Sequence, residues 1–500
     1  MTGERKAEVA HRGLITAAVM TATIMHAIDT TIPNVALPHM QGSLLATQEQ
    51  IAWVLTSYIV AAAIMTPPTG ALAVRLGRRR LFLIAILGFT LASALCGIAG
   101  SLTEMLIYRA LQGAFGAGLV PLSQATLLDA YPRERHGEAM ALWGMGFVAA
   151  PIFGPTVGGY LTEAYDWRWI FYINVPVGIM AALGVWYALP ETKTDRDAGF
   201  DWTGFAFIAL AIGALQIMLD RGHHLEWFGS TEIIVMAVIS ALAFYLFFVH
   251  SLTTEKPLID FAVFRDRNFI SGLVISFLVA VVVLAMLALL SHLLQDVLEY
   301  PVIDAGHIMG PRGLGTLCAM LIAGRMVSRI DPRYLIFLGV SLTAWAFWLM
   351  TKFTLNVGPW DLVWTGFVQG FGMGCIYVPL STFSFSTLPA EHRTTGASLF
   401  SLVRNIGASA GIAVLEALLA RNRQVFRATM VEGITPYDVR FREPSAAAPW
   451  DLQTLEGLLS LSGEVDRQAK MLAYLADFQW MMGITLLILP MLLIGRRRRH

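Results

Sequence analysis

The sequence is poor in charge for its length. Only 14% of its 500 residues are Asp, Glu, Lys or Arg, and 56% are hydrophobic; in a typical soluble domain about 25% of residues are charged. No single soluble core buries that much apolar surface. Lipid must therefore solvate most of the chain.

Sequence motifs for several kinds of chemistry are missing as well. None of the five lysines stands in a Gly-x-x-x-x-Gly-Lys-Ser/Thr loop, which argues against ATP-driven pumping. The three cysteines, Cys96, Cys318 and Cys375, lie far apart in apolar runs. We expect them to be buried small side chains rather than metal ligands. With no nucleophile elbow and no catalytic domain, the sequence predicts no enzyme, no cofactor and no metal site.

What the chain does have is a series of long apolar runs. A transmembrane helix needs about 20 such residues, and the runs therefore predict an all-α integral membrane protein. We place fourteen spans at residues 14–38, 51–73, 81–100, 104–128, 138–162, 168–189, 202–219, 231–250, 268–290, 303–328, 333–351, 359–386, 394–420 and 474–494.

Lys and Arg gather in alternate loops between these runs. By the positive-inside rule, this pattern places both termini in the cytoplasm, as expected for a multi-pass protein of the cytoplasmic membrane with an even number of spans. Polar stretches divide the chain into a six-span half (1–190), two extra spans (191–267) and a second six-span half (268–500). We expect 421–473 to be a long external loop whose second part is an amphipathic helix.

One carboxylate, Asp29, lies inside the first apolar run. An acid at membrane depth costs ~2.5–3.5 kcal/mol on insertion scales, and it usually marks a functional site. Asp29 lies about nine residues from the outer end of the first run, roughly 13 Å deep. Arg109 lies about five residues from the outer end of the fourth run, roughly 8 Å deep, so the two are within one helical turn of the same level. We therefore predict that they pair, with Arg109 keeping Asp29 ionised until a proton competes. The alternative is a static structural ion pair.

Two further residues are candidates for the proton or substrate site. His26 lies three residues before Asp29; it either adds to the site or is simply hydrogen-bonded. Arg312, beside Pro311 and Gly313 in the tenth run, is the candidate from the second half. Its alternative role is to bridge the free carbonyls of a kinked helix.

Glycine recurs in two motifs. The loop after the second run carries Gly70, Arg75, Gly77 and Arg78. The glycines allow two helix ends to approach, and the arginines can bind a carboxylate or terminal carbonyls; this predicts a gating loop, against the alternative of a basic loop that only sets topology.

The fifth run holds the second glycine motif. Its residues Gly154, Pro155, Gly158 and Gly159 predict close helix packing and a bend. We interpret the motif as a hinge at an interface between repeats, with generic tight packing as the alternative.

Together these motifs resemble the major facilitator superfamily, and in particular its 14-span drug:proton antiporters of the EmrB/QacA type. The resemblance covers nearly the whole chain. It rests on the motifs at Asp29–Pro38, Gly70–Arg78, Arg109–Gly113, Gly154–Gly159 and Trp167–Pro176. One departure is Val74, where the superfamily often has an aspartate. With that acid missing, Asp129 is left to pair with Arg75.

The resemblance implies two six-helix bundles plus two extra helices. It also implies proton-coupled multidrug efflux of amphipathic, often cationic, compounds by alternating access. The alternatives are a proton-linked exporter of a dedicated metabolite, such as a siderophore, fatty acid or natural product, and a non-transporting sensor on the same fold. Relatives in double-membraned bacteria work with a periplasmic adaptor and an outer-membrane channel, which are possible partners here; nothing predicts a nucleic-acid partner.

Overall fold

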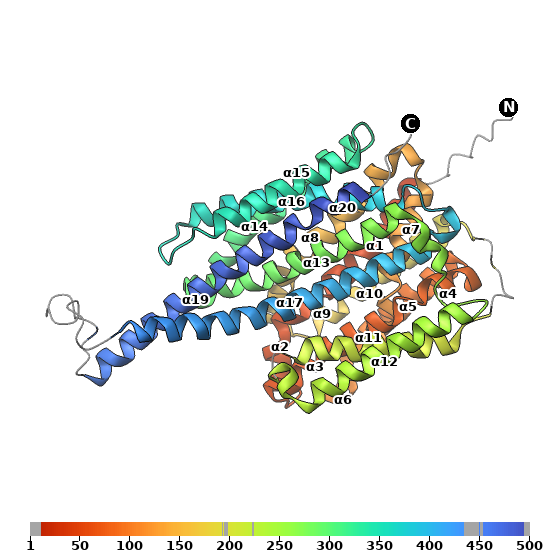
Figure 1. The fold of residues 1–500 in the computed structure, drawn as a ribbon. Helices are drawn as coiled ribbons and strands as arrows, with labels where there is room; N and C mark the ends of the chain where they lie inside the picture. Colours follow the sequence, from red (N-terminus) through yellow and green to blue (C-terminus); the bar gives the residue numbers. More distant parts are fainter. Residues whose placement is uncertain are drawn as a thin grey trace.

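The computed structural model describes residues 12–192, 194, 199–222, 225–434, 450 and 454–494. Over these residues the regular structure is helical throughout, without a strand (Figure 1). The all-α prediction is therefore confirmed for the part of the chain that is described.

The first half of the chain contains ten α-helices. They are α1 (Arg12–Asp29), α2 (Ile32–Ser43), α3 (Gln48–Met65), α4 (Thr69–Leu76), α5 (Arg78–Ile98), α6 (Leu102–Gly116), α7 (Leu119–Ala130), α8 (His136–Ala164), α9 (Trp169–Tyr172) and α10 (Asn174–Ala188). A 3-10 turn, η1 (Arg133–Arg135), precedes α8.

The middle and second half continue in the same way. They contain α11 (Trp202–Arg221), α12 (Thr231–Thr253), α13 (Arg267–His292), α14 (Val302–Met326), α15 (Pro332–Met350), α16 (Pro359–Phe385), α17 (Arg393–Glu432), α19 (Leu455–Leu486) and α20 (Ile488–Ile494). Short 3-10 turns are η2 (Trp227–Gly229), η3 (Phe261–Arg265) and η5 (Ala390–His392), and a π-helical turn, η4 (Leu293–Val297), ends α13.

Within the described residues, nine helical segments are long and apolar enough to cross a membrane. The number rises to eleven if each of two bent pairs is one span. Three more helices of 25 to 29 residues, α8, α14 and α16, pack among them but are not in that set. The structure thus supports many membrane helices without confirming the count of fourteen.

The first two predicted spans are broken rather than straight. The axis bends by 44° between α1 and α2, and by 58° between α3 and α4. At the first break the hydroxyls of Thr30 and Thr31 donate to the carbonyls of Ala27 and Ile28 near the end of α1, and the Ile28 carbonyl also accepts the Thr31 N–H at 3.0 Å. Asp29 is the last residue of α1, so the break places its carboxyl at a helix end inside the bundle.

In the segment 421–473, the amphipathic helix predicted for the second part is present, whereas the loop predicted for the first part is wrong over 421–432, which are helical. Helix α17 continues to Glu432, and α19 begins at Leu455, so the two form an antiparallel hairpin that extends beyond the other helices (Figure 1). Arg423 on α17 donates two hydrogen bonds of 2.9 Å to Asp466 on α19. The predicted helix thus pairs with an extension of α17 that was expected to be loop; residues 435–449 lie outside the described part.

The two halves meet at the end of the molecule opposite this hairpin, where Arg12, Asp129 and Arg393 lie; we call it the terminal end. There α8 packs so tightly on α14 that a Cβ at Gly137 would lie 1.9 Å from Val327 and 3.0 Å from the Gly324 carbonyl. Nearer the hairpin, a Cβ at Gly306 or Gly310 of α14 would meet no atom within 4 Å. The contact between α8 and α14 is therefore tight at the terminal end, while α14 faces open space at these two glycines.

Candidate functional site

The Asp29 carboxyl is 0% exposed and accepts three hydrogen bonds from three side chains. Arg109 Nη1 donates to Oδ2 at 2.9 Å, while Gln112 Nε2 and Asn174 Nδ2 each donate to Oδ1 at 2.8 Å. The predicted pairing of Asp29 with Arg109 is present. Because hydrogen bonds to a carboxylate favour its charged form, this arrangement stabilises Asp29 as an anion.

Arg109 is itself fully bound in the interior, at 1% exposure. Its Nη1 also donates to Gln112 Oε1 at 2.7 Å, and its Nε donates to the Val54 carbonyl at 3.2 Å. Its guanidinium carbon lies 4.3 Å from the centre of the Tyr58 ring, where a cation–π contact adds to the pairing. A buried ion pair keeps its charges when hydrogen bonds satisfy its groups, and here both Asp29 oxygens and the Nε and Nη1 of Arg109 have partners.

Sequence reasoning missed two direct partners of Asp29, Gln112 and Asn174. Asn174, at the start of α10, donates both to Asp29 and, at 3.0 Å, to Ser93 Oγ on α5. Ser93 in turn donates to the Phe171 carbonyl at 2.9 Å. Asn174 lies within Trp167–Pro176, which the sequence analysis used only as a family signature; an Asn opening an apolar run was the available signal.

His26 joins this cluster indirectly. Its Nδ1 shares a 3.0 Å hydrogen bond with the Tyr58 hydroxyl, and Tyr58 lies against Arg109. No hydrogen bond between His26 and Asp29 occurs among the described residues. The structure therefore agrees with the alternative in which His26 is simply hydrogen-bonded, here to Tyr58, and does not contact the Asp29 carboxyl directly.

Arg312 lies in a different group, in the second half. Its Nη2 donates to the Val283 carbonyl on α13 at 3.3 Å, while its Nη1 is buried without a partner. Both amide atoms of the fully buried Gln369 are also unpartnered. Arg312 and Arg404 both act electrostatically on Tyr377, and the Arg404 guanidinium lies 4.7 Å from the Phe147 ring on α8. The structure thus does not place Arg312 in the Asp29 cluster.

At the terminal end, the prediction that Asp129 pairs with Arg75 is wrong. Asp129 pairs with Arg78, which begins α5, and with Arg393, which begins α17 in the other half. Arg75 is exposed instead, because it lies on the outer side of α4. The predicted gating loop thus contains one arginine, Arg78, that engages Asp129.

The loop glycines lie where no side chain fits. Gly77 has φ of +85°, a conformation open chiefly to glycine. A Cβ at Gly70 would lie 2.8 Å from the Thr395 Cα, so this glycine allows α4 to touch α17 across the halves.

The glycines of α8 lie against the break that follows Asp29. A Cβ at Gly154 would lie 2.2 Å from Thr31 Oγ1, and one at Gly158 would lie 3.1 Å from the Ile32 carbonyl. Gly159 has more room, with Val35 at 3.8 Å. The Pro155 side chain lies outside the described part, and the helix backbone runs on through it to Ala164. The close packing predicted for this motif is present, and it involves the segment next to the site.

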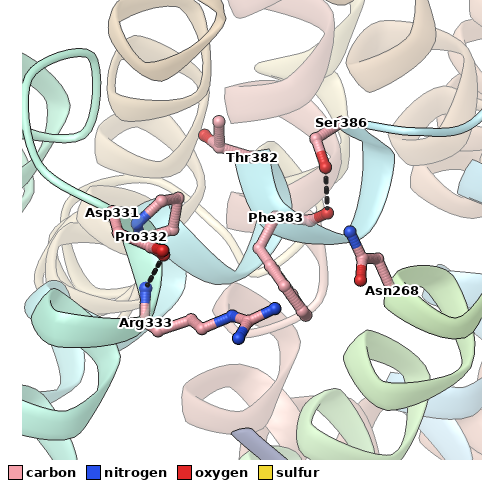
Figure 2. Close-up of a pocket in the computed structure, with 7 residues that line it drawn as sticks. All are labelled: Asn268, Asp331, Pro332, Arg333, Thr382, Phe383 and Ser386. Carbon is pink, nitrogen blue, oxygen red and sulfur yellow. Dashed lines mark hydrogen bonds between the residues drawn. The ribbon is translucent and has the colours of Figure 1, made fainter. Parts of the chain in front are cut away.

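A small pocket at the terminal end is separate from all of these residues (Figure 2). The Arg333 guanidinium lies 5.6 Å from the Phe383 ring there, and Asp331 accepts the Arg333 backbone N–H at 3.0 Å. Its lining residues are Asn268, Asp331, Pro332, Arg333, Thr382, Phe383 and Ser386. None of them belongs to the predicted transport site.

Two remaining sequence predictions concern binding groups. Cys96 and Cys375 are buried as expected, but Cys318 is exposed on α14, so that part of the cysteine prediction is wrong. Among the described residues, no group of three or more His, Cys, Asp or Glu side chains is placed to hold a metal ion.

A bundle of apolar helices, with two halves in contact at one end and a buried ion pair inside one half, defines a helical membrane transport protein. A family model described as Major Facilitator Superfamily matches residues 19–412. The chain is 36% identical over 461 residues to the multidrug export protein EmrB of Escherichia coli K12, covering 92% of this chain and 88% of that protein.

Two further comparisons agree. The fatty acid resistance protein FarB of Neisseria gonorrhoeae is 36% identical over 434 residues, covering 86% of this chain and 85% of that protein. The solved structure of the proton:xylose symporter XylE shares 12% identity, with a TM-score of 0.61 and 97% of each chain covered, and so shares the fold. The chain therefore belongs to the major facilitator superfamily.

Proposed function

We propose that this protein is a proton-coupled multidrug efflux transporter that exports amphipathic compounds across the cytoplasmic membrane by alternating access. Its relatives named multidrug export protein EmrB support the multidrug assignment. The observation that carries the coupling is the buried carboxyl of Asp29 with its three donors. An ionisable group inside a membrane bundle is costly unless it has a function.

Coupling requires that Asp29 bind a proton in one state and release it in another. In the described conformation, the hydrogen bonds from Arg109, Gln112 and Asn174 favour the anion. A shift of α6 or α10 removes donors from the carboxyl, and a less solvated carboxylate then takes up a proton. The backbone can change its angle at the α1–α2 break, where the glycines of α8 pack, without interrupting the hydrogen bonds of a straight helix.

The terminal end is the cytoplasmic end in this proposal. Basic residues gather there, including Arg78, Arg135, Arg267, Arg329 and Arg393, as the positive-inside rule requires. Counting α8, α14 and α16 with the eleven apolar spans gives fourteen crossings, in halves of six with α11 and α12 between them. The ion pairs of Asp129 then close the cytoplasmic side of an outward-facing transporter.

One observation favours the alternative cargo, an acidic amphipath such as a fatty acid. Within the described residues, Arg312 and Arg404 have no carboxylate partner, and Gln369 has both amide atoms free. A buried cation without a partner is costly, and a substrate carboxylate relieves that cost. A lipophilic cation gains no such contact there. The relative named fatty acid resistance protein FarB is consistent with this reading.

We also propose that a periplasmic adaptor, leading to an outer-membrane channel, docks on the hairpin. Beyond the bundle this hairpin exposes apolar side chains, including Val425 at 53%, Leu455 at 74% and Leu459 at 64%. A contiguous group of exposed apolar side chains rimmed by polar residues, rather than a single one, marks an interaction site. Loss of adaptor cross-linking in Leu459→Asp, with Glu456→Gln as the matched control, supports this contact; unchanged cross-linking refutes it.

Transport from inverted membrane vesicles tests the main proposal. An acid-inside pH gradient should drive accumulation of ethidium, oleate or both, and a protonophore should abolish it. Accumulation of oleate but not ethidium selects the acidic-amphipath alternative. If the uptake of every tested compound is the same with and without the pH gradient, proton coupling is excluded.

A further inference from the structure

A second buried carboxyl, Asp477, lies in the middle of α19. Its side chain is 0% exposed, and neither of its oxygens has a hydrogen-bond partner. Its helix face packs on the second half, where neighbouring Phe478 meets Phe353 with ring centres 6.4 Å apart. Asp477 lies three residues inside the last predicted span, 474–494.

The surroundings of Asp477 are the opposite of those of Asp29. Asp29 accepts hydrogen bonds from Arg109, Gln112 and Asn174, whereas Asp477 accepts none. Removing an unpaired carboxylate from water costs several kcal/mol, but a protonated carboxyl costs much less. Two acids placed in opposite environments take different protonation states at the same pH.

Charged and titratable groups on the packed elements do not supply a counter-ion. Helix α17 presents Glu416 and Arg423, and the π-helical turn presents Asp296; these act on the Tyr474 hydroxyl, one turn before Asp477. Arg423 is already bound by Asp466, and His292 on α13 pairs with Asp296.

The remaining packed elements add no cation either. Helix α15 carries only Arg333 and Tyr334, both at its terminal-end start, and α20 carries no titratable residue. Lys352, after α15, lies 3.4 Å from the centre of the Trp348 ring and is exposed.

We propose that Asp477 is a second proton-binding site, which holds a proton in this conformation and exchanges it with water at the hairpin end during transport. The carboxylate and one proton give the neutral acid, and the reverse step returns the proton. Tyr474, Glu416 and the 63%-exposed Asp296 mark a route from that water. The π-helical turn beside α19 supports the assignment, because such turns occur frequently at functional sites.

Infrared spectroscopy of the purified protein in lipid discs tests the bound proton directly. At neutral pH, the wild type should show the carbonyl-stretch band of a protonated carboxyl. The band should vanish in Asp477→Asn, shift in Asp477→Glu, and persist in Asp29→Asn and in the exposed control Asp296→Asn. An unchanged band in both Asp477 variants, or no such band in folded wild type, overturns the proposal.

The exchange step rests on the proposed function and has its own measurement. If one proton per cycle passes through Asp477, Asp477→Asn loses the free energy of that proton in every cycle. The highest ratio of inside to outside ethidium or oleate that the vesicles reach should then fall about tenfold for each pH unit of the imposed gradient. Glu456→Gln, which neutralises an exposed acid at the start of α19 outside this route, should leave it unchanged. If Asp477→Asn reaches the same substrate gradient as the wild type, the proton exchange at Asp477 is refuted. If the wild type shows no proton-driven transport, the proposed function is refuted, but the infrared test of the bound proton remains valid.

Discussion

Arg393 donates a hydrogen bond to Asp129, although the two residues lie 264 positions apart in the chain. Asp129 ends α7 in the first half and Arg393 begins α17 in the second, so the contact joins the halves at the terminal end. Arg78 binds the same carboxyl from α5. One acid therefore holds two arginines, one from each half, and its charge is placed to control whether this end is closed.

Neutralising that acid should open the terminal end. In Asp129→Asn, Arg78 and Arg393 lose their shared partner, which should shift the equilibrium by roughly 1–3 kcal/mol toward the open state. Spin labels can be attached at Arg135→Cys and Arg329→Cys, two exposed positions on opposite halves, in a protein that lacks the native cysteines. The distance between the two labels should be larger in Asp129→Asn than in the protein with Asp129. Glu134→Gln, an exposed acid at the same end, is the control; equal label distances in both variants would disprove the gate.

The same end should also respond to pH through His136. Burial, together with the nearby charge of Arg393, lowers the pKa of His136 to about 4. When the halves separate, its pKa should return toward 6.5, so the closed state binds fewer protons than the open one. The closed state is then fully stable above pH 6.5 and loses about 1.4 kcal/mol per unit as the pH falls toward 4.

The measurement for His136 is the label distance as a function of pH. The wild-type distance should increase between pH 6.5 and 4, and His136→Gln should flatten that change. A wild-type profile that His136→Gln leaves intact would assign the titration to another group.

The interface between α14 and α16 gives a matched pair for stability. A Cβ at Gly370 would lie 1.9 Å from the Arg312 carbonyl oxygen, so Gly370→Ala must push two helices apart. We expect a loss of ~1–3 kcal/mol and a lower melting temperature in detergent. Gly310→Ala, where a Cβ meets no atom within 4 Å, should be neutral or slightly stabilising. Similar melting temperatures for the two variants would contradict the packing.

The unpaired cations of the second half predict a charge preference. Arg312→Gln removes a guanidinium whose Nη1 lacks a partner, so it should weaken binding of oleate roughly tenfold while changing ethidium binding little. Arg325→Gln, an exposed arginine later in α14, controls for the general loss of charge. If both ligands weaken equally in Arg312→Gln, the residue supports the fold rather than substrate choice.

The membrane helices and the central ion pair follow from simple rules applied to the sequence. Apolar runs predicted the helices, and the depths of Asp29 and Arg109 predicted their contact. Asn174 and Ser93 did not stand out, because neutral polar side chains in apolar runs usually bond to their own helix. Asp477, three residues inside the last predicted span, was inconspicuous because acids near span ends usually reach water.

The other errors concern contacts between distant segments. Hydropathy cannot show that the polar residues 421–432 continue a membrane helix and pair with the amphipathic helix predicted after them, as Arg423 does with Asp466. Nor can spacing show that Arg393 reaches Asp129. Without an aspartate at position 74, spacing could not decide whether Arg75 or Arg78 of the same loop reaches Asp129, and that choice needed the folded chain.

The central claim is that the charge of Asp29 couples transport to the proton gradient, and vesicles carrying Asp29→Asn test it most directly. The isosteric amide should abolish accumulation driven by a pH gradient, yet preserve exchange of labelled for unlabelled substrate at equal pH, since only the titrating group is lost. Gradient-driven accumulation at the wild-type rate in this variant would contradict the account.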